Sequence, residues 1–127
     1  MFNKSDFILK KTQYLSSYEY ETENYKIKIS ENEFSDESVS YMQKFVEIYP
    51  IKVKDIAKAI MDLEWFEDYF PEESVKSVEK KLGKPIFNYN SLYTIITYVE
   101  NTIDENHIID VEIGGMYEVF YNISFDG

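Results

Sequence analysis

The hydrophobic pattern of this chain changes period twice, and that change limits the folds open to it. Residues 7–30 have the pattern of strands, most clearly at Tyr25, Ile27 and Ile29, which alternate with lysines. Residues 35–82 instead repeat apolar side chains every three or four positions, and from Ile86 onward the alternation returns. Alternation is the period of a strand, whereas spacing of three and four is the period of a helix that faces a core. Strands, then helices, then strands predict an α+β fold.

The N-terminal segment should form two or three antiparallel strands, and three helices should follow over residues 35–49, 53–70 and 71–82. Ser35 or Asp36 can cap the first helix. This helix should end at Tyr49–Pro50, because the residue before a proline disfavours helical geometry. Pro71 fits the first turn of the third helix, and Gly83 supplies the left-handed position that follows its end.

The segment after Ile86 should form a C-terminal antiparallel β-meander. Leu92–Val99 is apolar on both faces and reads as a central strand. A polar loop over residues 100–106 precedes a strand at His107–Ile113, and Gly114–Gly115 suits a two-residue hairpin into a return strand at 116–125. We expect both strand segments to join in one antiparallel sheet that carries the helices, within a single domain over residues 1–127.

The charge of the chain limits its partners. It has 24 acidic residues against 13 basic ones, all lysines, for a net charge of -11. Such a surface repels phosphate backbones and attracts basic proteins, so we expect a basic protein partner and no direct nucleic-acid binding. No apolar region follows Lys4, and no apolar stretch is long enough to cross a bilayer. A cytoplasmic protein without a membrane partner is therefore expected.

His107 is the single histidine, and cysteine and arginine are absent. Asp104, Glu105 and Asp110 lie near His107 in sequence, which leaves two interpretations: a general base or metal ligand, or a structural histidine at the start of a strand. We favour the structural one, because no nucleophile or full ligand set accompanies it. We therefore expect no catalytic residue, no cofactor, no bound metal and no enzymatic activity. A carboxylate-based, metal-dependent hydrolase is the alternative from another class.

The sharpest local feature is residues 64–73, where five carboxylates and four aromatic residues occupy ten positions. Aromatic side chains anchor protein interfaces, and carboxylates steer basic partners. The candidate partner-binding residues are Glu64, Trp65, Glu67, Asp68, Tyr69, Glu72 and Glu73. The alternative is a solvated acidic face with Trp65 against the core. The many tyrosines on strands have the same two interpretations, packing or an adhesive surface.

Three stretches, Val75–Pro85, Asn106–Ile113 and Tyr121–Gly127, resemble small uncharacterised bacterial α+β proteins of the toxin-immunity type. The resemblance implies a cytoplasmic, toxin-neutralising protein, and it assigns no functional residue. Together with the charge, it leads to the hypothesis of an immunity protein that binds and occludes a basic toxin domain such as a nuclease. The alternative binding function is an acidic mimic of nucleic acid that blocks a DNA- or RNA-binding protein.

Overall fold

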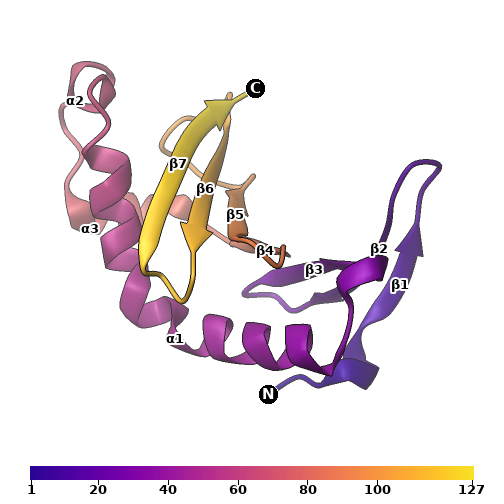
Figure 1. Cartoon of the computed structure of the whole chain (residues 1–127). Helices are drawn as coiled ribbons and strands as arrows, with labels where there is room; N and C mark the ends of the chain where they lie inside the picture. Colours follow the sequence, from indigo (N-terminus) through magenta and orange to yellow (C-terminus); the bar gives the residue numbers. More distant parts are fainter.

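The computed structural model describes residues 1–127 as a seven-stranded sheet with helices on one face (Figure 1). This confirms the predicted α+β fold, with strands at both ends of the chain and three helices between them. The strands are β1 (Ile8–Lys11), β2 (Ser16–Glu21), β3 (Lys26–Ser30), β4 (Ile86–Tyr89), β5 (Thr94–Tyr98), β6 (Ile108–Gly114) and β7 (Val119–Asp126). The helices are α1 (Asp36–Met61), α2 (Phe66–Tyr69) and α3 (Val75–Leu82), with short 3-10 turns at Lys4–Asp6 and Glu31–Glu33.

The strands lie in the sheet in the order of the sequence, and every neighbouring pair is antiparallel except β3 and β4. The expectation of a wholly antiparallel sheet was therefore wrong at this one pairing. The helices form a long crossover between the two strands, and such a connection can return the chain to run parallel to the strand it left. The parallel pair joins the N-terminal hairpins to the C-terminal meander.

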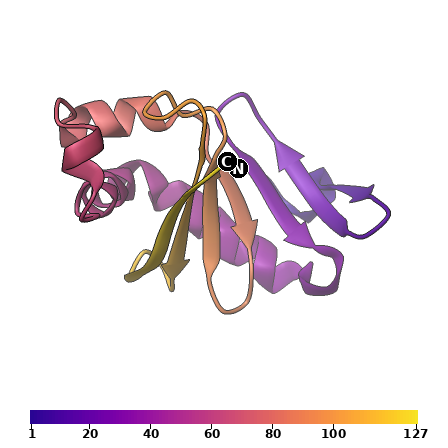
Figure 2. The same cartoon turned by 90° about the horizontal axis from the view of Figure 1, so that it is seen from above.

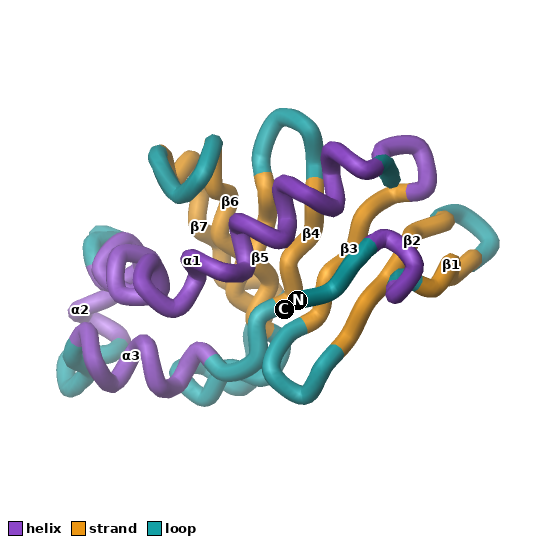
Figure 3. Tube along the Cα trace, turned by 90° about the horizontal axis from the view of Figure 1, so that it is seen from below, coloured by secondary structure: helices purple, strands orange, loops and turns teal.

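Helix α1 crosses one face of the sheet (Figure 3). Contrary to the prediction, it does not end at Tyr49–Pro50 but continues to Met61 with Pro50 in the middle of its 26 residues. Pro50 is exposed, so the backbone carbonyl that loses its partner there can turn toward water. Figure 1 shows the helix changing direction about midway. As predicted, Ser35 caps the start, its hydroxyl accepting from the Ser38 N–H at 3.1 Å.

The predicted second helix, 53–70, is divided in the structure. Its first half belongs to α1, a turn follows at Asp62–Trp65, and only four residues form α2. The break lets Phe66, 2 % exposed, enter the core. The third helix begins at Val75 rather than at Pro71, because Ser74 caps it through the Ser77 N–H. Gly83 follows it with a positive φ of 77°, as expected.

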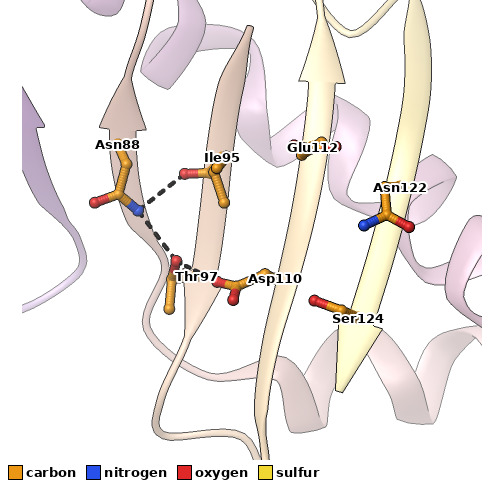
Figure 4. Close-up of a pocket in the computed structure, with 7 residues that line it drawn as sticks. All are labelled: Asn88, Ile95, Thr97, Asp110, Glu112, Asn122 and Ser124. Atoms are coloured by element: carbon orange, nitrogen blue, oxygen red, sulfur yellow. Dashed lines mark hydrogen bonds between the residues drawn. The ribbon is translucent and has the colours of Figure 1, made fainter. Parts of the chain in front are cut away.

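Alternation along the strands gives the sheet one covered and one open face. Ile27, Ile96 and Val111 are fully buried beneath the helices. Their strand neighbours on the other side are polar or half-exposed, and the helices lie behind the sheet as seen from this side (Figure 4). On the covered side the hydroxyls of Tyr49 and Tyr98 lie 2.7 Å apart. Burial raises the pKa of Tyr49 to about 12 and that of Tyr98 well above its usual range.

The β6–β7 connection differs from the predicted two-residue hairpin. Gly114 pairs with Val119, so four residues form the turn. Within it Tyr117 takes a positive φ of 63°, a conformation that favours glycine. Contacts of its side chain offset the unfavourable backbone conformation. The ring stacks on that of Phe45 with centroids 4.1 Å apart, and the hydroxyl donates to the Phe45 carbonyl oxygen at 2.7 Å. Core packing of one aromatic side chain thus decides the shape of this turn.

Candidate functional site

The seven predicted partner-binding residues lie together where the chain turns from α1 through α2 into α3. We call Glu64, Trp65, Glu67, Asp68, Tyr69, Glu72 and Glu73 the acidic corner. Figures 1 and 2 place it at one end of the molecule, with the β1–β2 hairpin at the other. Its carboxylates belong to three segments, the turn before α2, α2 itself and the turn after it.

Aromatic packing holds the acidic corner to the sheet. The ring of Trp65 meets Phe125 of β7 edge to face, with centroids 4.9 Å apart. Phe70 lies against both of these rings. Trp65 nevertheless keeps 36 % of its surface exposed, and Tyr69, in edge contact with it, keeps 73 %. The corner therefore presents two aromatic rings to solvent, and the partly buried Phe70 and Phe125 support Trp65, which is the arrangement of an interface anchor.

Four of the carboxylates are exposed and have no ion-pair partner: Glu64, Glu67, Asp68 and Glu72. Glu73 differs, because it accepts from Lys81 Nζ at 2.7 Å and from the Ser77 hydroxyl at 2.7 Å. The Lys81 hydrogen bond is the main cause that lowers the pKa of Glu73. Glu73 thus braces α3, while the other four leave an uncompensated negative field at the corner.

His107 lies far from the acidic corner in sequence, on the loop before β6. Its Nδ1 is 2.8 Å from an Asp104 carboxylate oxygen, and no third ionisable group joins them. Asn101 ties the same loop together by donating to the carbonyl oxygens of Tyr98 and His107. Asp110, the other carboxylate near His107 in sequence, instead accepts from Thr97 at 2.6 Å on the open face. The pair links the start of β6 to the loop that precedes it.

The open face of the sheet carries a shallow polar hollow that the sequence analysis did not single out. Figure 4 shows its lining: Asn88, Ile95, Thr97, Asp110, Glu112, Asn122 and Ser124. Asn88 donates to Thr97, and Thr97 donates to Asp110, so much of its polar capacity is internally satisfied. Small-molecule pockets are walled mainly by apolar side chains, and this hollow has one. The sequence signal for this hollow was the set of polar residues that alternate with the buried ones along the strands. These residues were interpreted only as solvent-exposed positions.

The strand tyrosines divide between the two interpretations. Most pack against the core: Tyr18, Tyr20, Tyr25, Tyr89, Tyr98 and Tyr117. Tyr14 and Tyr121 remain 85 % and 62 % exposed. Tyr121 covers Gly114, where a side chain would meet its ring. Packing is therefore the rule for the strands, and the exposed tyrosines lie at a hairpin tip, on β7 and in the acidic corner.

No protein-family model, curated protein or solved structure matches this chain. None of its helices is both long enough and apolar enough to cross a lipid bilayer. The case for a function therefore depends on the geometry and charge of the chain's own surface.

Proposed function

We propose that this chain is an immunity-type inhibitor, a cytoplasmic protein that binds a basic toxin domain, such as a nuclease, and occludes it. The observation that carries the proposal is the acidic corner. It combines four unpaired carboxylates with two exposed aromatic rings, Trp65 packed on Phe125 of β7 and Tyr69 packed on Trp65. A purely solvated face has no need of aromatic rings at its centre, and a purely structural tryptophan has no need of uncompensated charge around it.

Each part of the corner has a distinct task in such a complex. The carboxylates raise the rate of encounter with a basic surface, because long-range attraction increases association rates by roughly 10- to 1,000-fold. Trp65 and Tyr69 would then lose their remaining exposure against the partner. The Trp65 ring is already held by Phe125 and Phe70, so it loses little side-chain entropy on binding, and Tyr69 packs edge to face on Trp65.

The test begins with capture of the partner from the source cells, followed by binding kinetics at two salt concentrations. Replacing the four unpaired carboxylates with Gln or Asn should slow association by about tenfold or more and flatten its salt dependence. The matched control neutralises four exposed carboxylates elsewhere, Glu23, Glu31, Glu47 and Glu105, with the same change in net charge. Equal association rates for the two variants would show that the corner is only solvated charge.

The aromatic anchors are tested separately through dissociation. Tyr69→Ala should raise the dissociation rate, with a loss of about 2 kcal/mol of binding energy if it is a hot spot. Its 73 % exposure makes an effect on folding small, so binding is cleanly measured. The functional readout is the activity of the captured partner, which an equimolar amount of the wild-type chain should suppress. A captured partner that keeps full activity in the complex would contradict an inhibitory role.

A further inference from the structure

A groove runs along the outer side of β7, the last strand of the sheet. Its lining comes from the end of α1 and from β7: Ala59, Asp62, Leu63, Phe120, Tyr121, Asn122 and Ile123. Phe120 and Ile123 pair with buried residues of β6, whereas Asn122 pairs with Glu112 on the open face, so the lining includes residues from both faces at the outer edge of β7. We call this the edge groove. It leads toward the acidic corner, because Phe125 of the same strand supports Trp65.

The edge of β7 has the properties of a strand that can accept another. β7 pairs with β6 alone, and no hydrogen bond outside that ladder involves its backbone. Beyond a bulge at Tyr121, residues 122–126 pair regularly with β6, so their outer N–H and C=O groups have the spacing of a sheet edge. Protected edges carry lysine, proline or bulges, or belong to short strands. β7 has eight residues, no lysine and no proline, and its one bulge leaves residues 122–126 in regular register.

The other wall of the edge groove selects the chemistry of an occupant. Ala59 and Leu63 offer an apolar surface beside β7. Asp62 is exposed at the rim and has no ion-pair partner, and Glu64 lies two residues further along the chain. A strand laid here would point alternate side chains toward the apolar helix wall and toward solvent. The charge at the rim favours basic side chains in the solvent-facing set.

We infer that the outer edge of β7 binds an extended basic segment of the partner as an eighth strand, in the edge groove beside α1. The inference rests on the proposed function and specifies how the partner docks. Backbone hydrogen bonds to β7 supply the attachment, as in other cases of strand addition. The segment alternates apolar and basic residues, and it places the rest of the partner against the acidic corner.

The first test uses a synthetic peptide of alternating lysine and valine, with the protein's single tryptophan, Trp65, as a fluorescent reporter. The peptide should bind, and backbone amide protons of β7 should exchange more slowly in the complex. A second peptide carries the same side chains but is N-methylated at alternate residues, which removes its hydrogen-bond donors on one edge. It should bind about tenfold more weakly. A glutamate–valine peptide should not bind.

A protein variant tests the groove from the other side. Ala59→Leu fills the space beside β7 without altering any charge and should weaken binding of the lysine–valine peptide by about tenfold, whereas Ala59→Ser should bind as the wild type does. Equal binding of the N-methylated peptide, or protection confined to residues 64–73, would overturn strand addition and leave the acidic corner as the binding surface. Failure of the proposed function would give a different result: the captured partner would associate at the same rate whether or not the four corner carboxylates are neutralised.

Discussion

Both ends of the sheet carry a cluster of aromatic side chains, but the two clusters differ in how far they are exposed to solvent. At the β1 end, aromatic rings close on one another: Phe2 and Phe7 are 3 % and 8 % exposed, and Tyr18 stacks on Phe34 at 3.9 Å. At the β7 end, Trp65 and Tyr69 rest on a similar aromatic support but project into solvent. The cluster at the β1 end covers one end of the core, whereas the cluster at the β7 end leaves Trp65 and Tyr69 partly exposed to solvent.

Charge follows the same division. Both carboxylates of β2 are paired with lysines: Glu19 lies 3.2 Å from Lys26, and Glu21 lies 2.6 Å from Lys84. At the acidic corner only Glu73 is paired. Unpaired like charges repel one another and gain nothing for the fold. Four unpaired carboxylates within nine residues, beside exposed aromatic rings, form a surface whose charge is better explained by binding than by stability.

The edge strands complete the contrast. β1 has four residues and ends in Lys10 and Lys11, which discourage pairing with another strand. β7 is twice as long, and its only charged residue is Asp126 at its end. The difference indicates that the sheet is closed to added strands at β1 and open to them at β7. The following predictions test whether the two ends really differ in this way.

The largest effect should come from truncating a ring of the sealed cluster. Phe7→Ala removes contacts with Phe2, Tyr20 and Phe34, whose ring centroids lie 5.7, 5.7 and 5.4 Å away. It should lower the free energy of unfolding by about 3 to 5 kcal/mol, as buried Phe→Ala changes do. Tyr69→Ala at the other end should change it by less than about 0.5 kcal/mol. Urea denaturation measures both, and similar losses would abolish the contrast.

Trp65 should give an intermediate result, because it belongs partly to the core and partly to the surface. Trp65→Ala should cost about 2 kcal/mol of folding stability. A double-mutant cycle with Phe125→Ala should reveal a coupling of about 0.5 to 1.5 kcal/mol, the range for an edge-to-face pair. Thermal and urea unfolding of the three variants give the cycle. Zero coupling would mean that the ring is not fixed to β7 and cannot act as a preformed anchor.

The comparison of the two ends could be foreseen only in part from the sequence. Periodicity predicted strands at both ends and helices between them, and local chemistry identified the Ser35 cap and the positive φ of Gly83. These depend on neighbours within a few residues. The parallel β3–β4 pair, the continuation of α1 through Pro50 and the turn containing Tyr117 depend on contacts between distant segments. Local propensity carries no information about such contacts.

The candidate site divides in the same way. The sequence placed five carboxylates and their aromatic neighbours together, because all lie within ten residues. It could not show that Glu73 is bound by Lys81 while its neighbours are free, since that depends on how α3 folds back. Nor could it reveal the edge groove, which joins Ala59 and Leu63 to residues about sixty positions later. The acidic corner could be predicted because its residues are close in sequence, whereas the edge groove could be recognised only in the folded chain.

The smallest expected effect separates the paired carboxylate of the acidic corner from its unpaired neighbours by pH. The Lys81 hydrogen bond holds the pKa of Glu73 below its ordinary value of 4.5 in the folded protein. A carboxyl whose pKa is lower when folded adds stability above its unfolded pKa and loses it as pH falls through the folded value. Glu73→Gln should therefore reduce the free energy of unfolding at pH 7 by up to about 1 kcal/mol.

This deficit should shrink as the pH falls below 4.5 and vanish once Glu73 is protonated in both states, because the wild type then loses the same interaction. The control is Glu67→Gln, whose carboxylate is exposed and has no ion-pair partner, and which should match the wild type at both pH values. Urea denaturation at a series of pH values measures both. If Glu67→Gln instead showed the pH-dependent deficit and Glu73→Gln did not, the division of the corner into one bracing carboxylate and four free ones would be wrong. The steering role given to the free carboxylates would then lose its basis.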